Sequence, residues 1–298
     1  MDSSLTPLSP VEQFVFRERD YYVKRDDLVD PLLSGNKYRK LYTLIQTPAN
    51  RYQKLISYGG IQSNAMLSIA ALCKQKGWSF SYTAKPVPQR LKDQPTGNLK
   101  MALELGMQLH EVSPEAYEQE ILQLNVQGDD SALFVPQGGA DPLAQSGINV
   151  LAREIRQWQL KTGIEKLNMV TPSGTGTTAY YLAVSMPEVS VITTAAVGNR
   201  DYLIEQMQHL GSLPVNLRIL ENEKKHHFAK PYPEFIAIYK ELKTAGIEFD
   251  LIYGANMWHT LMQHVDAIEG PILYIHSGGL IGNKTMFDRY RHKGLLID

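Results

Sequence analysis

The chain has 298 residues and 43% of them are hydrophobic, which is enough for one large domain or two modest domains with a buried core. Thirty basic residues against thirty-one acidic residues give a formal net charge of −1, which excludes an overall electrostatic attraction to nucleic acid or to an anionic membrane. The single cysteine, Cys73, excludes an intrachain disulfide bond and a multi-cysteine metal site, and it fits a reducing compartment.

The N-terminal stretch MDSSLTPLSPVEQ does not have the basic region and following apolar region of a secretion signal. No run in the sequence approaches the roughly 18 apolar residues that a membrane span needs. We therefore expect a soluble cytoplasmic protein with a small-molecule partner and with no membrane or nucleic-acid partner.

A cluster of basic residues marks the segment between residues 24 and 40. A helix is predicted to begin in the stretch SGNKYRK, where Lys37 directly follows Gly35 and Asn36. The other basic side chains are expected to pair with two nearby aspartates or to face solvent: Lys24, Arg25, Arg39 and Lys40 beside Asp26 and Asp27. Its place after Gly-Asn sets Lys37 apart from them.

Short apolar runs of strand length alternate with helical patterns along most of the chain. The predicted strands cover residues 54–57, 79–83, 132–135, 168–171 and 189–197. A predicted helix follows each of them, at residues 63–76, 98–105, 146–157, 177–186 and 202–210. This alternation predicts an α/β fold with parallel sheets and crossover helices.

The stretch VTPSGTGTTAYYLAV leads from a predicted strand through a Ser/Gly/Thr loop into a helix. Such a turn presents unpaired backbone N–H groups and the positive end of a helix dipole to an anion. Two glycines allow a close approach and four side chains add hydroxyl donors: Gly174, Gly176, Ser173, Thr175, Thr177 and Thr178. The pattern indicates a phosphate site, with plain helix capping as the alternative, and it matches neither GxGxxG nor a Walker A loop.

A second glycine-rich turn, SYGGIQSN, opens the next helix with Gln62, Ser63 and Asn64. This helix start can hold a carboxylate through its N–H groups and the Ser63 hydroxyl, and the alternative is a serine N-cap. Two further predicted strands end in Gly-Gly, in PQGGADPL and IHSGG. Because ligands of open α/β sheets gather at the carboxyl ends of strands, we expect one shared cleft for a ligand with a phosphate and a carboxylate.

A phosphate site together with one singular lysine indicates pyridoxal phosphate, whose aldehyde requires an amine. The chain resembles the family of 1-aminocyclopropane-1-carboxylate deaminases and D-cysteine desulfhydrases, which are fold type II (tryptophan-synthase-β-like) pyridoxal-phosphate enzymes. The resemblance is carried in order by VKRDDLVDPLLSGNKYRKL, GGIQSN, GNLKMALELG, PQGGADPLAQSG, SGTGTT, IYGAN and LYIHSGG.

The resemblance implies two open, twisted, mostly parallel α/β domains with the cofactor in the cleft between them. Residues 1–50 and 151–298 would form the larger, cofactor-binding domain, and residues 51–150 a smaller inserted domain. A homodimer is also implied, and no metal site is expected, because the histidine pairs lack metal-binding spacing.

The resemblance also implies roles for individual residues. Lys37 matches the lysine that forms the Schiff base and moves the Cα proton, Asn64 matches the residue that contacts the ring hydroxyl of the cofactor, and Ser277 would lie against the pyridine nitrogen. The phosphate cradle corresponds to Ser173, Gly174, Thr175, Gly176 and Thr177. Substrate contacts correspond to Gln62, Ser63, Asn64 and Tyr253, with Ser63 and Tyr253 also able to move protons.

Two of these residues have purely structural alternatives. Lys37 could be a solvated lysine of a first helical turn, and Tyr253 a half-buried tyrosine at a strand end. The chain also departs from the family. Gly254 stands where cyclopropane deaminases have an acidic residue, Asn256 replaces a lysine and Ala65 replaces a frequent histidine. Phe228 replaces a second tyrosine, which would leave Tyr253 as the one phenol of the site.

These departures favour elimination of a good leaving group over the opening of a cyclopropane. We expect a D-cysteine desulfhydrase-like lyase that yields pyruvate, ammonia and sulfide from a small amino acid. The alternatives are a 1-aminocyclopropane-1-carboxylate deaminase, a racemase or deaminase of other specificity, and a pyridoxal-phosphate-binding protein without turnover.

Overall fold

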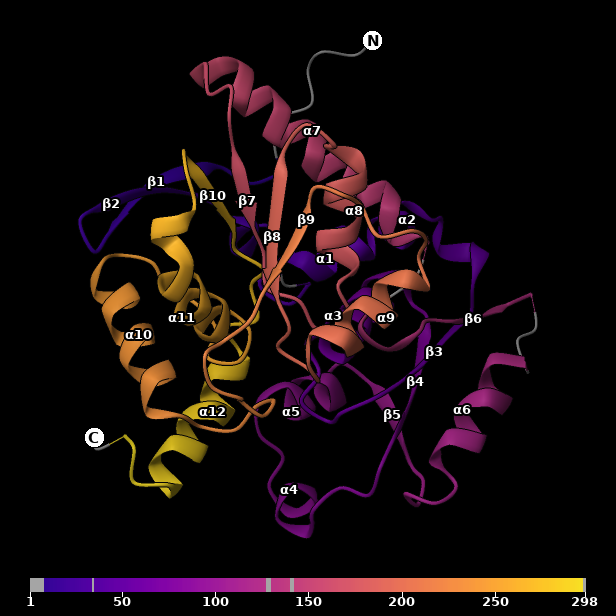
Figure 1. Cartoon of the computed structure of the whole chain (residues 1–298). Helices are drawn as coiled ribbons and strands as arrows, with labels where there is room; N and C mark the ends of the chain where they lie inside the picture. The colour runs from indigo at the N-terminus through magenta and orange to yellow at the C-terminus, as the bar shows by residue number, and fades with distance from the viewer. Residues whose placement is uncertain (1–7, 34, 127–129, 140–141, 297–298) are drawn as a thin grey trace.

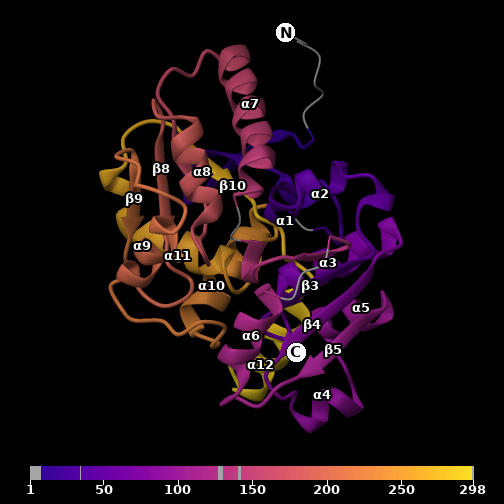
Figure 2. The ribbon, with the colours of Figure 1, turned by 90° about the vertical axis from the view of Figure 1, so that its right-hand side faces the viewer.

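The strands form two separate sheets in a computed structural model that describes residues 8–33, 35–126, 130–139 and 142–296. The larger sheet has the order β1-β2-β10-β7-β8-β9 (Figure 1), with bounds Val11–Phe16, Arg19–Lys24, Ile272–Ile275, Asn168–Val170, Ser190–Thr194 and Leu217–Leu220. The smaller sheet has the order β5-β4-β3-β6, with bounds Met107–Glu111, Ser79–Ala84, Lys54–Tyr58 and Ala132–Phe134. The two sheets occupy different parts of the molecule in both ribbon views (Figure 2).

Strand direction follows from the connections. β1 and β2 form an antiparallel pair, whereas the other described pairs run parallel, as strands joined by crossover helices do. The helices of the first half are α1 Asn36–Lys40, α2 Tyr42–Gln46, α3 Asn64–Lys76, α4 Gln89–Asp93, α5 Gly97–Glu104 and α6 Tyr117–Val126. Those of the second half are α7 Ala144–Thr162, α8 Thr177–Ser185, α9 Arg200–Gln208, α10 Pro233–Thr244, α11 Gly254–His264 and α12 Gly282–His292.

Helices cover both faces of the larger sheet. Successive side chains of a strand point to opposite faces, so neighbouring residues pack in different clusters. On β7, Val170 packs in a cluster with residues of α10, α11 and α12, whereas its neighbour Met169 packs with residues of α7, α8 and α9. Ile192 and Val191 of β8 divide in the same way. The smaller sheet has its own core, which includes Leu55 and Phe80 with residues of α3 and α5.

Each predicted strand and helix is present, with ends that shift by a few residues. The predicted α/β class with mostly parallel sheets is therefore confirmed. The division at residues 50 and 150 stays a prediction; α7 crosses the second boundary and packs against α1 and α8. In the described part of the chain, no helix is both long enough and apolar enough to cross a membrane.

Candidate active site

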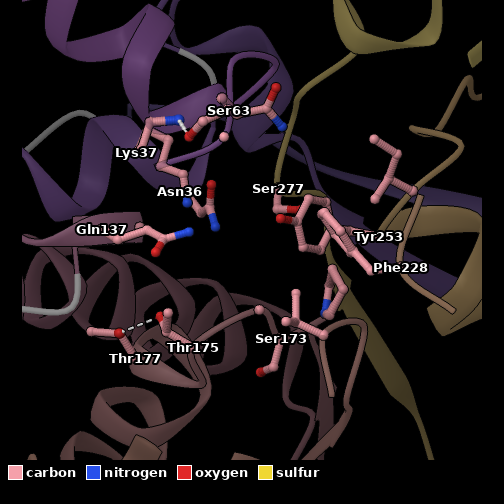
Figure 3. A pocket seen from close by; sticks show the side chains of 18 of the residues that line it. Asn36, Lys37, Ser63, Gln137, Ser173, Thr175, Thr177, Phe228, Tyr253 and Ser277 are labelled. Atoms are coloured by element: carbon pink, nitrogen blue, oxygen red, sulfur yellow. Dashed lines mark hydrogen bonds between the residues drawn. The ribbon is translucent and has the colours of Figure 1, made fainter. Parts of the chain in front are cut away.

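A cavity of about 870 Å³ lies where strands of both sheets end (Figure 3). Its walls include residues that follow β3, β6, β7, β8 and β10, so the predicted shared cleft at the carboxyl ends of strands exists. Every predicted site residue lines it: Lys37, Gln62, Ser63, Asn64, Ser173, Gly174, Thr175, Gly176, Thr177, Tyr253 and Ser277. Their chemical roles stay predictions.

Lys37 reaches the cavity because α1 begins directly against the end of β10. The Asn36 N–H donates to the Ser277 carbonyl at 3.2 Å. Gly35, with φ of +46°, precedes the helix, and a Cβ there would lie 2.3 Å from the Ser277 carbonyl. Glycine is therefore required, both for its backbone angle and for the close approach. Ser34 of the same motif lies outside the described residues.

Two lysines of α1 line the cavity and both have depressed pKa values. Burial lowers the pKa of the Lys37 amine to about 8. Burial and the adjacent charge of Lys37 hold the pKa of Lys40 well below its usual value. The prediction that Lys40 pairs with an aspartate or faces solvent is wrong: its Nζ donates to the Gly138 carbonyl at 2.9 Å and lies 3.5 Å from Thr175 Oγ1. Lys40 thus lies beside the predicted phosphate cradle.

The loop between β7 and α8 has the form of an anion cradle. Gly176, at φ of +76°, precedes α8, and a Cβ there would lie 2.3 Å from Met207. The hydroxyls of Thr175 and Thr177 are 2.9 Å apart. Thr178 is buried and lines the cavity, and its hydroxyl has no hydrogen-bond partner among the described residues. Unpaired donors at a helix start fit a phosphate.

Ser173 holds this loop in place. Its backbone forms a bridge with Ala195, and its Oγ accepts a hydrogen bond of 2.7 Å from Thr193. Because these contacts extend the pairing of β7 with β8 beyond the strands, the cradle starts from a fixed position. Figure 3 shows Thr175 and Thr177 across the cavity from Lys37 and Ser63.

The start of α3 forms the opposite wall. Ser63 is its N-cap, since its Oγ accepts from the N–H groups of Ala65 at 3.2 Å and Met66 at 3.3 Å. Asn64 accepts from Asn98 Nδ2 at 2.8 Å, which orients its own amide. Gln62 also bonds with Asn98, through the Asn98 N–H at 3.0 Å. The capping role of Ser63 is therefore confirmed, and its hydroxyl still faces the cavity.

Tyr253 stands at the third side, beside Phe228 and Ser277 (Figure 3). Its N–H donates to Asp250 at 2.6 Å, and its ring lies 5.6 Å from that of Phe228. Burial and the nearby Asp250 carboxylate raise the pKa of Tyr253. Tyr253 is not the one phenol of the cavity, because Tyr58 and Tyr202 also line it.

The structure explains one departure from the family pattern. The Gly254 N–H donates to Asp250 Oδ2 at 2.9 Å, and a Cβ at position 254 would lie 2.9 Å from that oxygen. Asp250 therefore occupies the space beside the start of α11 that a side chain at 254 would need. Asn256 is buried and bonds Asn222 at 2.8 Å, and Ala65 is buried in α3.

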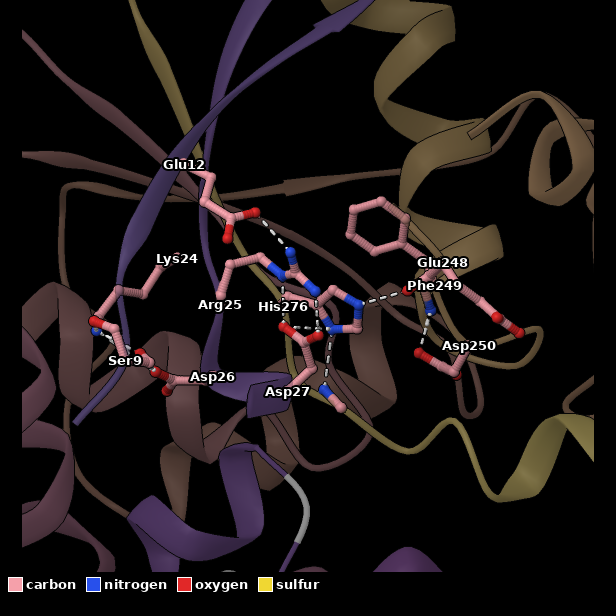
Figure 4. A network of polar contacts seen from close by, with 12 residues as sticks. Ser9, Glu12, Lys24, Arg25, Asp26, Asp27, Glu248, Phe249, Asp250 and His276 are labelled. Atoms are coloured by element: carbon pink, nitrogen blue, oxygen red, sulfur yellow. Dashed lines mark hydrogen bonds and ion pairs between the residues drawn. The ribbon is translucent and has the colours of Figure 1, made fainter. Parts of the chain in front are cut away.

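Behind α1 lies a network of buried charges that does not line the cavity. Arg39, fully buried, donates to Asp26 at 2.7 Å and to Glu154 at 2.8 Å. Lys24 is also buried and lies 2.7 Å from Glu154. Figure 4 shows Lys24 beside Asp26 and Ser9, and, in a second group, Arg25 between Glu12 and Asp27. The predicted pairing of these cations with the aspartates is confirmed.

Comparisons with known proteins point to one family. No family model matches the chain. The chain is 29% identical over 311 residues to a Thermotoga maritima protein that carries the provisional name of a 1-aminocyclopropane-1-carboxylate deaminase, and the match covers 95% of this chain and 96% of that protein. It is 26% identical over 302 residues to the D-cysteine desulfhydrase of Serratia proteamaculans, covering 93% of this chain and 92% of that protein.

A solved structure described as a 1-aminocyclopropane-1-carboxylate deaminase homologue matches with a TM-score of 0.77 at 22% identity, over 97% of this chain and 94% of that chain. At this identity the likeness establishes the fold, which is that of fold type II pyridoxal-phosphate enzymes. Over nearly its whole length the chain is thus similar to proteins named as 1-aminocyclopropane-1-carboxylate deaminases and D-cysteine desulfhydrases, and the resemblance found in the sequence is confirmed.

Proposed function

We propose that the chain is a pyridoxal-phosphate-dependent lyase that eliminates the thiol of a small amino acid, with D-cysteine as the leading substrate. The overall reaction consumes cysteine and water and yields pyruvate, ammonia and sulfide. The observation that carries the proposal is the place of Lys37: an amine with a pKa near 8 shares one cavity with an anion cradle at the start of α8.

The cavity offers a partner for each end of the cofactor. The cradle of residues 173–177, with Thr178 and Lys40, would hold the phosphate through N–H groups, hydroxyls and the Lys40 amine. Asn64 would donate to the ring hydroxyl, and Ser277 would lie near the ring nitrogen. The bound cofactor would supply a carbonyl for the Lys37 amine and an electron sink for the Cα carbanion.

The chain's own residues would provide binding and proton transfer. The start of α3, with the Ser63 hydroxyl, would bind the substrate carboxylate through the helix dipole and N–H groups. Lys37, in its neutral form, would take the Cα proton. Tyr253 has a raised pKa and keeps its proton at neutral pH, so it could donate that proton to the departing sulfur.

The start of α11 favours thiol elimination over ring opening of 1-aminocyclopropane-1-carboxylate. Cyclopropane deaminases carry an acidic side chain after the tyrosine, and here Asp250 fills that space beside Gly254. The name of the Thermotoga relative favours the cyclopropane reaction as the second candidate. The two reactions differ in product, since ring opening gives 2-oxobutanoate and ammonia.

The first experiment records the absorption spectrum of the purified protein with pyridoxal phosphate, before and after D-cysteine, and assays pyruvate and sulfide in the same sample. A yellow band that changes as pyruvate appears supports the proposal. Product from 1-aminocyclopropane-1-carboxylate and none from D-cysteine selects the second candidate. A band that no amino acid changes indicates a binding protein without turnover, and the absence of a band contradicts the assignment of the cofactor.

We also propose a homodimer that acts in the cytoplasm, as the family resemblance and the single buried cysteine indicate. Light scattering of the purified protein tests the dimer. A monomer at all concentrations would contradict it.

A further inference from the structure

Arg289 lies on α12 and lines the cavity, and it is the most C-terminal of the α12 residues that do so. One face of this helix lines the cavity with residues spaced three or four apart: Gly282, Thr285, Met286 and Arg289. Thr285 Oγ1 lies 3.4 Å from Gln62 Oε1, and Arg289 Nη1 donates to the Ala229 carbonyl at 2.8 Å. Since Phe228 packs on Tyr253, Arg289 is tied to the substrate side of the proposed site.

The charges around the cavity are unbalanced. Of the described residues that line it, none is Asp or Glu, whereas Lys37, Lys40 and Arg289 are basic. The proposed function uses Lys37 for the amine chemistry and Lys40 for the phosphate. Arg289 has no carboxylate partner among the described residues, and one of its five N–H groups is engaged by Ala229. Arg289 is exposed, so its unneutralised guanidinium stands at the solvent edge of the cavity, where it can bind an anion.

The segment that holds Arg289 is itself constrained and basic. Ala229 has φ of +54°, in the left-handed region that non-glycine residues rarely adopt. Its carbonyl is thereby turned to Arg289, which keeps the guanidinium beside Phe228. The neighbouring stretch KKHHFAK, residues 224–230, adds three lysines, with Glu223 directly before it and Glu234 bonded to His226. The contact with Ala229 therefore fixes where the guanidinium lies at the cavity edge.

We propose that Arg289 binds the anionic end of a substrate side chain. The preferred substrates are then amino acids whose β-thio substituent ends in a carboxylate or sulfonate, and this inference rests on the proposed function. In the elimination, the Cβ–S bond breaks and its electron pair leaves with sulfur, which takes up a proton and departs as an acidic thiol. The remaining three-carbon unit takes up water and becomes pyruvate and ammonia.

The test compares S-carboxymethylcysteine with S-carbamoylmethylcysteine, an uncharged amide of nearly the same shape, each as the D and the L form. Binding to the cofactor-loaded enzyme is followed by the change in its absorption spectrum, and turnover by pyruvate. We expect the wild type to bind the carboxylate at least about tenfold more tightly than the amide. Arg289→Gln should weaken binding of the carboxylate alone, and Arg289→Lys should retain part of the preference.

Lys284→Gln is the matched control, because Lys284 lies on the same helix, is exposed and does not line the cavity. It should leave the preference unchanged. Equal affinity of the wild type for both compounds overturns the inference, and so does equal weakening of both compounds by Arg289→Gln, which would assign Arg289 to support of the 228–229 segment. If D-cysteine and both analogues leave the spectrum unchanged and give no pyruvate, the proposed function fails and this inference fails with it.

Discussion

Four of the cations between residues 24 and 40 divide into two groups, according to whether a carboxylate pairs with them. Lys24 and Arg39 are buried against Asp26 and Glu154, so their charges are compensated. Lys37 and Lys40 have no carboxylate within ion-pair distance in the described part of the chain, and burial lowers the pKa of both. The same short helix therefore carries a charged anchor on one side and amines that readily lose a proton on the other.

The largest effect is expected at the amine itself. Lys37→Ala should lower turnover by on the order of a thousandfold or more, because the proposed role of this amine combines covalent attachment of the cofactor with proton transfer. The protein should also lose the lysine-dependent absorption band while keeping its fold, as circular dichroism would show. Lys284→Ala, which removes an exposed lysine outside the cavity, serves as the control. Full retention of the band in Lys37→Ala would move the assignment to another lysine.

The next largest effect is expected at Arg39, a buried charged residue of α1. Arg39→Met leaves Asp26 and Glu154 buried with one fewer partner, so the free energy of unfolding should fall by about 3–5 kcal/mol. Arg17→Met is the matched control, because Arg17 and Glu241 form an exposed pair that contributes about 0–1 kcal/mol. Urea unfolding of both variants measures the difference. Equal destabilisation by the two substitutions would refute the division into a buried anchor and exposed pairs.

Lys40 separates the two groups further, since it is buried like Arg39 but faces the cavity. Lys40→Met should weaken the affinity for pyridoxal phosphate by about 10- to 100-fold, because the Lys40 amine next to Thr175 is lost as a hydrogen-bond donor. Its effect on urea unfolding of the cofactor-free protein should be smaller than that of Arg39→Met. Titration of both variants with the cofactor measures the first quantity. Unchanged affinity with a large loss of stability would assign Lys40 to the framework.

The strands that the sequence predicts most clearly include two that are largely buried in the larger sheet. β7 and β8 are short and apolar, and each leads into a clear helical pattern. The hairpin of β1 and β2 escaped prediction because its turn places Arg17 and Glu18 at φ of +47° and +60°, without the Asn or Gly that such turns favour. β5 reads MQLHE and is largely exposed, so it has no apolar run.

The site residues that lie in loops after strands could be predicted from the sequence. The prediction was incomplete for residues whose position depends on contacts with distant parts of the chain. Gly174 and Ser63 lie in the loops that lead from apolar strands into helices, which is a local signal. Arg39 meets Glu154 across 115 positions of sequence, and no local pattern reveals such a contact. A usable signal existed for Lys40, because residues three apart on a helix share a face and Lys37 was already placed.

The smallest expected effect is the pH dependence of the Lys37 amine, which tests whether it differs from an ordinary lysine. With a pKa of about 8, the neutral fraction of Lys37 should rise about fivefold between pH 7 and pH 8 and less than twofold more by pH 9. An ordinary lysine, with a pKa near 10.4, would gain about tenfold per pH unit over the whole range. Because the neutral amine reacts with the aldehyde, the rate of pyridoxal-phosphate uptake by the cofactor-free protein should level off above pH 8. Lys37→Ala supplies the background from other lysines. A rate that still climbs about tenfold between pH 8 and pH 9 would show that burial does not set this amine apart from the solvated lysines of the surface.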